Sequence, residues 1–191
     1  MGRLRLKFKI RKHLLKPAIQ TPSPNCDERT NAEDISLLVI HNISLPPGEF
    51  GGPEIQDFFQ NNLDIAAHTY FQEIAQLRVS SHLLIRRDGQ VLQFVPFNLR
   101  AWHAGVSNFQ GREKCNDFSI GIEMEGTDEI PYTDEQYEAL ADITRELMHH
   151  YPAITPDRIT GHSDIAPGRK TDPGPSFDWD RYENLIAFQS S

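Results

Sequence analysis

The stretch from 161 to 174, GHSDIAPGRKTDPG, constrains this chain more than any other, because no helix or strand can run through it. Its two prolines lack a backbone N–H, and its glycines favour turns. The pattern predicts a loop with fixed corners. Such a loop presents His162, Lys170 and Asp172 from one short piece of backbone.

Two of these side chains are ordinary zinc ligands. A catalytic zinc site needs three protein ligands and an open position for water, and the loop supplies His162 and Asp172. The best candidate for the third ligand is His41, which ends the apolar run LLVI at 37–40. A core histidine bonded to backbone is the alternative for an isolated His41. The presence of His162 and Asp172 in the loop favours the ligand interpretation.

Size and charge narrow the class of protein. A chain of 191 residues with 38% apolar content suits one domain. The formal charge is −8, but residues 1–17 carry seven Lys or Arg and no acid, which leaves 12 basic against 27 acidic residues, or −15, for the rest. An acidic body argues against nucleic acid as the main partner. No obligate protein partner is evident.

The basic arm alternates basic and apolar residues between positions 3 and 11. It lacks the apolar run of about seven residues that a secretory signal needs, and no stretch of the chain reaches transmembrane length. We therefore expect a cytoplasmic protein without stable membrane insertion. The two cysteines, Cys26 and Cys115, form no disulfide framework, which fits a reducing compartment. The arm is expected to be a solvated tail or an added edge strand, with attraction to an anionic membrane surface as the alternative.

Hydrophobic patterns predict an α/β fold in a single domain. The run at 35–43 is typical of a buried strand, and strands at 79–86 and 91–95 flank the hairpin signal Asp88-Gly89. With the alternating segment 118–125, these strands form a central mixed sheet. We expect helices to flank the sheet and a zinc cleft to lie on one side of it.

Four helices are expected. The longest begins at the capping box of Thr133 and ends near His150, whose position with its neighbour His149 suits the helix dipole better than a metal. The other three are predicted at 54–59, 65–77 and 178–188.

The segment FSIGIEME at 118–125 places Glu123 and Glu125 on the same side of a strand, because side chains alternate between faces. If that side faces solvent, both are surface charges. If it faces the histidine-containing loop, one of them becomes the general base of a zinc hydrolase.

Five segments in order carry a family resemblance: VIHNISLPPGEFGGP, RVSSHLLIRRDG, AWHAG, CNDFSIGIEMEG and GHSDIAPGRKTDPGPSFDW. Together they resemble the zinc-dependent N-acetylmuramoyl-L-alanine amidases, the type that includes phage lysozyme amidases and peptidoglycan recognition proteins. The resemblance runs from about Ser23 to Trp179. It implies an amidase domain at 20–191 behind a basic extension at 1–19.

The resemblance also implies residue roles. His41, His162 and Asp172 match the zinc ligands of the family, Glu123 matches the proposed general base, and Lys170 matches the cation near the metal. The implied reaction is hydrolysis of the amide between the lactyl group of N-acetylmuramic acid and L-alanine, on small 1,6-anhydro-muropeptides during peptidoglycan recycling.

Two positions depart from the family pattern. Many relatives have a catalytic Tyr just before the histidine of the hairpin strand, and this chain has Ser81 there. We therefore expect Glu123 to perform the role of that Tyr. Other relatives use Cys as the third ligand, where Asp172 makes an all-N/O site.

Substrate contacts follow less directly. A muropeptide carries carboxylates, so local cations should receive them, while an amide side chain fixes a peptide group and aromatic rings pack on sugar or peptide. The candidates, in that order, are Arg78, Lys114, Asn42, Trp102 and His103. Ordinary scaffold roles remain the alternative for each.

Two other functions compete with this prediction. A non-catalytic module that binds peptidoglycan fragments is one, although such binders usually lose a zinc ligand. An envelope amidase acting on intact cell wall is the other, and the missing export signal argues against it.

Overall fold

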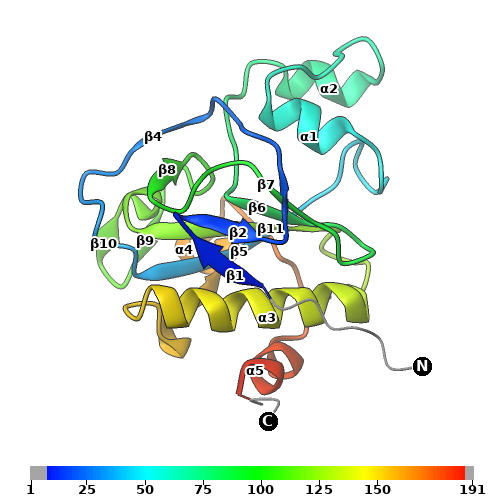
Figure 1. The fold of residues 1–191 in the computed structure, drawn as a ribbon. Helices are drawn as coiled ribbons and strands as arrows, with labels where there is room; N and C mark the ends of the chain where they lie inside the picture. The colour runs from blue at the N-terminus through cyan, green and yellow to red at the C-terminus, as the bar shows by residue number, and fades with distance from the viewer. Residues whose placement is uncertain (1–7, 188–191) are drawn as a thin grey trace.

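The computed structural model describes residues 8–187, so positions 1–7 of the basic arm lie outside the described part. At its centre is β5 (Leu37–Ile43), whose first four side chains are fully buried. A strand covered on both faces requires a continuous apolar run rather than alternation. The expected strand at 35–43 is therefore confirmed, two residues shorter at its start (Figure 1).

Within residues 8–187, six strands form the main sheet, in the order β12–β5–β11–β6–β7–β3. The pairs β12–β5, β5–β11, β11–β6 and β7–β3 are parallel, and the β6–β7 hairpin is antiparallel. The mixed sheet predicted from the sequence is thus present. Beyond β5, its strands are β3 (Ile19–Gln20), β6 (Leu83–Ile85), β7 (Val91–Gln93), β11 (Ser119–Glu125) and β12 (Ile159–Gly161).

Helices cover the sheet on both sides (Figure 1). The long α3 (Asp134–His150) and the terminal α5 (Trp179–Ala187) lie on one side, and the short α1 (Glu54–Phe59) and α2 (Thr69–Ile74) lie at the opposite end of the molecule. The predicted capping box starts α3, because Thr133 Oγ1 accepts from Gln136 N–H while the Gln136 side chain accepts from Thr133 N–H.

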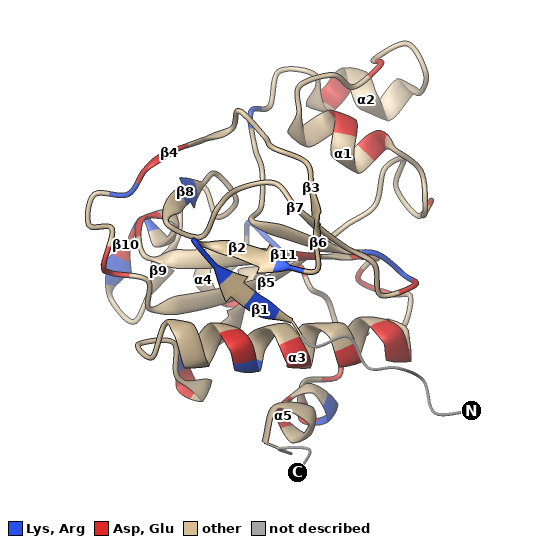
Figure 2. Ribbon diagram, viewed as in Figure 1, with Lys and Arg blue, Asp and Glu red and all other residues tan. Residues whose placement is uncertain are grey.

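In its described part, the basic arm is a structural element rather than a solvated tail. From position 9 it forms an antiparallel hairpin, β1 (Lys9–Arg11) with β2 (Leu14–Lys16), and β3 then joins the edge of the main sheet. Leu15 is fully buried. Glu146 of α3 accepts from the backbone N–H of Ile10 and from Lys9, at 2.8 and 2.9 Å. Basic residues on β1 therefore lie beside acidic ones on α3 (Figure 2).

The predicted helix at 65–77 is reduced to α2. Its N-cap is His68, whose Nδ1 accepts from Tyr70 N–H, and Asp64 accepts from Ala66 N–H in a turn before it. These local side-chain bonds compete with helix formation over the first residues. The strand expected at 79–86 is likewise limited to β6.

Smaller elements complete the fold. They are β4 (Cys26–Glu28) paired with β8 (Leu99–Ala101), β9 (Asn108–Phe109) paired with β10 (Arg112–Glu113), the short α4 (His162–Ile165), and the 3-10 turns η1 (Cys115–Asp117) and η2 (Pro156–Arg158). Among residues 8–187, no helix combines the length and apolar character that crossing a bilayer demands.

Candidate active site

Three parallel strands bring the candidate metal ligands and the candidate base to one edge of the sheet. The register places Glu123 of β11 opposite His41 of β5, and Gly161 of β12 opposite Ile40. His162 follows Gly161 directly, so both histidines lie at the carboxyl ends of adjacent strands. Open sheets with parallel strands commonly bind ligands at this edge.

His41, His162 and Asp172 form a tight triangle of ligating atoms. His41 Nδ1 lies 2.9 Å from His162 Nδ1, and each of these nitrogens lies 3.0 Å from Asp172 Oδ2. The loop holds Asp172 there, because Ser163 N–H donates to the Asp172 carbonyl oxygen at 2.9 Å. Ligands bound to zinc at about 2.0–2.1 Å in a tetrahedron are roughly 3.3 Å apart. The three predicted ligands therefore converge within a few tenths of an ångström of zinc geometry.

The outer bonds of the histidines decide which ring nitrogens carry protons. His162 Nε2 lies 3.1 Å from the carbonyl oxygen of Ala104, which can only accept, so Nε2 carries the proton and Nδ1 is a lone pair. His41 Nε2 lies 2.9 Å from His103 Nδ1. Burial lowers the pKa of His41 to about 4, so its ring is neutral at pH 7.

Asp172 supplies the negative charge of the triangle. Burial opposes its ionisation, but in the metal-free site, where His41 Nδ1 can carry a proton, hydrogen bonding to the histidine rings outweighs burial and holds its pKa below the ordinary range. If His41 donates from Nε2, two lone pairs and a carboxylate point at one spot with no proton between them. Such an arrangement requires a cation, so the donor set fits zinc.

Glu123 is buried at 8% exposure and faces the same space. Its Oε2 has no hydrogen-bond partner among the described residues. Burial, and then the charge of Asp172, raise its pKa well above the ordinary range, while Lys170 offsets part of that rise. An unpartnered, buried carboxyl group with a raised pKa is typical of an acid–base residue. The alternative of a solvent-facing surface charge is wrong for both Glu123 and Glu125.

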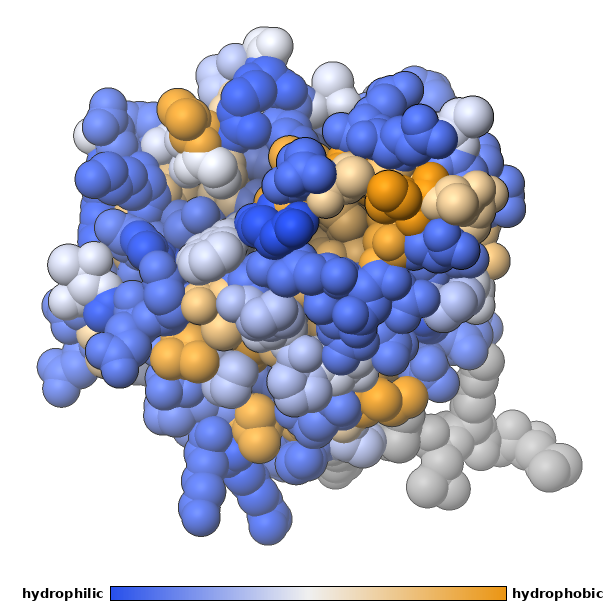
Figure 3. Space-filling model, turned by 90° about the horizontal axis from the view of Figure 1, so that it is seen from above, coloured by the Kyte–Doolittle hydropathy of each residue, from blue (hydrophilic) through white to orange (hydrophobic). Residues whose placement is uncertain are grey.

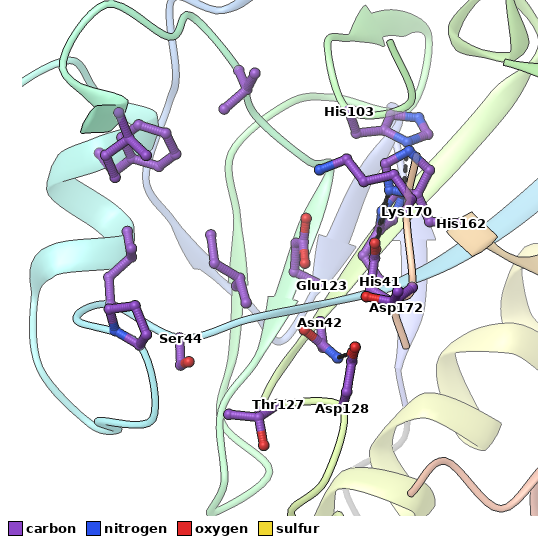
Figure 4. A pocket seen from close by; sticks show the side chains of 18 of the residues that line it. His41, Asn42, Ser44, His103, Glu123, Thr127, Asp128, His162, Lys170 and Asp172 are labelled. Carbon is purple, nitrogen blue, oxygen red and sulfur yellow. Dashed lines mark hydrogen bonds and ion pairs between the residues drawn. The ribbon is translucent and has the colours of Figure 1, made fainter. Parts of the chain in front are cut away.

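Lys170 lies on the wall of the same cavity and is exposed. Figure 4 shows its side chain beside the three histidines, with Glu123 facing the same space. The Asp172 carboxylate lies 3.0 Å from a ring nitrogen of His41 and 3.0 Å from one of His162.

A cavity of about 720 Å³ opens in front of this cluster. Seen from above, the molecule is mostly hydrophilic, with apolar side chains at the hollowed part of the surface (Figure 3). One wall carries the titratable cluster and the polar segment 127–129. The other wall is mostly apolar and comes from the loop after β5, from α1 and α2, and from the segment that follows; it contains Leu45, Pro47, Phe58, Phe59, Tyr70, Ile74, Leu77 and Val79.

Three of the five predicted substrate residues line the cavity, namely Asn42, Trp102 and His103. The Asn42 amide nitrogen donates to Asp128 Oδ1 at 2.8 Å and to the Pro173 carbonyl at 3.1 Å. These bonds tie Asn42 to the loop that bears Asp172. The Trp102 indole donates to Asp27 Oδ1 at 3.1 Å.

The structure places the two predicted cations elsewhere. Arg78 is exposed and lines a separate small hollow, where its guanidinium donates to the carbonyls of Ala75 and Leu77. Lys114 is exposed at a left-handed position before η1 and is not among the cavity-lining residues. Their roles remain predictions.

Sequence reasoning missed Arg169, which lines the cavity and donates to the carbonyls of Ala104 and Val106 at 2.6 and 2.7 Å. Its place beside Lys170 in the constrained loop was the available signal. Ser81 is fully buried and its hydroxyl donates to the Leu83 carbonyl, so it faces away from the chemistry.

Fold and cluster together define an α/β protein with a candidate metal-dependent hydrolytic site. The chain belongs to the N-acetylmuramoyl-L-alanine amidase family, whose model matches residues 31–175.

Individual relatives agree with this membership. The chain is 63% identical over 173 residues to the "1,6-anhydro-N-acetylmuramyl-L-alanine amidase AmpD" of Salmonella typhimurium, which covers 91% of this chain and 92% of that protein. A crystal structure of a selenomethionine AmpD derivative superimposes with a TM-score of 0.90 at 60% identity, covering 93% of this chain and 98% of the other. The structure of the Escherichia coli amidase AmiD with anhydro-N-acetylmuramic acid-L-Ala-D-gamma-Glu-L-Lys matches with a TM-score of 0.58 at 26% identity. The match covers 94% of this chain and 65% of the AmiD chain.

Proposed function

We propose that this protein is a zinc-dependent amidase that cleaves the bond between the lactyl group of 1,6-anhydro-N-acetylmuramic acid and the L-alanine of the stem peptide, in peptidoglycan recycling. The names of the AmpD relatives and the ligand of the AmiD complex support this substrate. A location in the cytoplasm is part of the proposal, and the two free cysteines fit it.

One observation carries the proposal: the convergence of His41 Nδ1, His162 Nδ1 and Asp172 Oδ2 within 3.0 Å of one another. These three atoms would hold the zinc ion. Zinc in such a site lowers the pKa of a bound water and polarises the substrate carbonyl.

The chain's own residues would handle the protons. Glu123 Oε2, unpartnered and facing the cavity, would accept the proton of the attacking water and then deliver it to the departing L-alanine nitrogen. Burial and the charge of Asp172 raise its pKa, which favours retention of the proton between the two transfers. The Lys170 ammonium would donate to the oxygen that becomes negative at the carbonyl under attack.

Shape supports a muropeptide as the ligand. The apolar wall beside α1 and α2 would receive the less polar faces of the sugar and lactyl groups. Asn42 and Trp102 remain candidates for substrate contact, although Asn42 can offer only its carbonyl oxygen while its amide nitrogen stays bonded to Asp128 and Pro173. Arg78 and Lys114 do not line the cavity, so their contact with stem-peptide carboxylates stays a prediction.

The test is hydrolysis of purified anhydro-muropeptides and of whole sacculi, followed by chromatography of released peptide. We expect release from anhydro-muropeptides, loss of activity after chelation, and recovery on adding zinc. Release only from sacculi would favour an envelope amidase. Binding of muropeptide without release would identify a non-catalytic recognition module and refute the enzyme proposal.

A further inference from the structure

The dipeptide His103–Ala104, between β8 and β9, contacts both candidate ligand histidines from behind. His103 Nδ1 lies 2.9 Å from His41 Nε2, and the Ala104 carbonyl oxygen lies 3.1 Å from His162 Nε2. Each contact uses the ring nitrogen opposite to the one in the ligand triangle. One short segment therefore faces the outer nitrogens of two histidines that come from different strands.

This dipeptide is itself held in place by side chains of three other segments. Asn116 Oδ1 accepts from the backbone N–H groups of His103 and Ala104, at 3.2 and 2.8 Å. Arg169 donates to the Ala104 carbonyl oxygen at 2.6 Å. The His103 ring reaches Ser119 Oγ at 3.1 Å through Nε2. Both peptide N–H groups and the carbonyl of Ala104 are thus engaged.

Packing fixes the His103 ring as well. It lies against β11 at Gly121, where an added Cβ would be 2.5 Å from the ring Cγ. Any larger residue at 121 would displace the ring. Gly121 lies two residues before Glu123 on the same strand. The sheet therefore sets the position of the His103 ring relative to His41.

A metal on His41 Nδ1 would set the direction of these contacts, because the His41 proton would then lie on Nε2. Both nitrogens of His103 are occupied, one by His41 and the other by Ser119. With Nδ1 accepting from His41 Nε2–H, His103 Nε2 donates to Ser119. No ring nitrogen of His103 is left for a substrate.

We infer that His103 and Ala104 are positioning residues for the metal site, and that His103 acts through His41 rather than on the substrate. Together they fix the Nε2–H tautomers of His41 and His162 and aim both Nδ1 lone pairs at the metal. This inference rests on the metal set of the proposed function. It replaces packing on sugar or peptide, which the sequence had suggested for His103.

The test compares two variants that match in the number of side-chain atoms. His103→Asn keeps an oxygen near the position of Nδ1 and can accept from His41, whereas His103→Leu cannot. Zinc affinity of the metal-free proteins is measured by competition with a chromogenic chelator. Loss of an outer-shell partner typically weakens metal binding about 10–100-fold. We expect that loss for His103→Leu and a clearly smaller one for His103→Asn.

Trp102→Phe is the matched control, because Trp102 lines the same cavity but bonds to Asp27 and not to a ligand. Its zinc affinity should equal that of the wild type. Thermal unfolding of each metal-free protein checks that the fold is kept. If His103→Leu does not fold, Ser119→Ala takes its place. This variant removes only the acceptor of His103 Nε2, so we expect it to weaken zinc binding, but by less than the loss expected for His103→Leu.

The outcomes separate this inference from the function on which it rests. Wild-type zinc affinity in a folded His103→Leu protein, with a raised KM for muropeptide, would overturn the inference and make His103 a substrate contact. Absence of zinc binding by the wild type would instead overturn the proposed function. Equal losses in the Leu and Asn variants would also count against the inference, because the bond to His41 would then be irrelevant.

Discussion

Glu123 and Glu125 lie two residues apart on the same face of β11, yet their surroundings differ completely. Glu125 is 1% exposed and accepts from Gly51 N–H and Arg87 N–H at 2.7 and 3.0 Å, with Arg86 3.5 Å away. Glu123 is 8% exposed and has an oxygen without a partner in the described chain. Glu125 is saturated with donors, whereas Glu123 keeps an oxygen to which no described group donates.

The contrast is between a carboxylate whose hydrogen bonds are satisfied and one with an oxygen that has no donor among the described residues. A buried charge that accepts several backbone hydrogen bonds stabilises the fold around it, and here it joins the glycine-rich loop after β5 to the β6–β7 hairpin. A buried carboxyl group without donors destabilises the folded state when ionised, and is retained where proton transfer is needed. Strand position alone does not distinguish the two.

The largest effect is expected for Glu123→Gln, which tests whether Glu123 is the general base. Because the amide cannot take up a proton, we expect kcat on anhydro-muropeptide to fall about 10²–10⁴-fold, the usual contribution of a general base. Zinc content and KM should change little. An activity within threefold of the wild type would show that Glu123 is not the base.

Stability as a function of pH tests the same glutamate without substrate. The folded-state pKa of Glu123 is raised, so between its unfolded value of about 4.3 and the folded value the native state binds the extra proton. The free energy of unfolding must therefore fall as pH rises through this window. Glu123→Gln lacks this loss, so its advantage over the wild type, measured by urea unfolding of metal-free protein, should grow with pH above about 4.3.

Asp172 supplies a control of opposite sign. Its pKa is lowered in the folded state, so its stabilising contribution is present above its unfolded value of about 3.9 and is lost as pH falls below it. Asp172→Asn should therefore be less stable than the wild type at neutral pH, with the difference shrinking only in acid. A Glu123→Gln advantage independent of pH would contradict the assignment of a raised pKa.

Glu125→Gln should produce the reverse pattern, with a structural cost and little catalytic cost. The new amide group would place a donor against Gly51 N–H or Arg87 N–H, leaving one of them unpaired at a cost of about 1–3 kcal/mol. We expect that loss in the free energy of unfolding, measured with denaturant, and kcat within a few-fold of the wild type. A catalytic loss as large as that of Glu123→Gln would end the distinction between the two glutamates.

The smallest effect is expected at the partner of Glu125. Gly51 has φ +83° with no atom within 4 Å of an added Cβ, so Gly51→Ala costs only backbone strain, about 1 kcal/mol. Gly48→Ala is a matched control, since Gly48 has the same φ of +83° and equal space but bonds to Ser44 instead. Both variants keep the backbone N–H, so their unfolding free energies should be similar, and an excess loss at Gly51 would report that strain at this position distorts its bond to Glu125.

Much of this architecture was predictable because its signals are local. Four patterns of a few consecutive residues each predicted an element. They are the apolar run of β5, the alternation of β11, the Asp88-Gly89 turn and the Thr133 capping box. The convergence of the three candidate ligands was also predictable, since chemistry restricts the residue types and the loop presents two of them together.

Other features depended on distant contacts. The β1–β2 turn uses left-handed backbone at Lys12 and His13, φ 50° and 63°, without the Gly or Asn that signals such turns. Its stability comes instead from Glu146 and the buried Leu15. The bond between His103 and His41 depends on how the 101–105 loop crosses β11 at Gly121, which no local pattern in the sequence encodes.

The apolar wall of the cavity, formed by short helices and loops, has a consequence for how such an enzyme can diversify. Neighbouring strands are held at a fixed spacing of roughly 4.8 Å, so the separation of His41 from Glu123 cannot be tuned without rebuilding the sheet. The segments around α1 and α2 carry no such restriction. Preference for one sugar or peptide over another can therefore drift through insertions and exchanges there, while the bond-breaking chemistry is inherited unchanged.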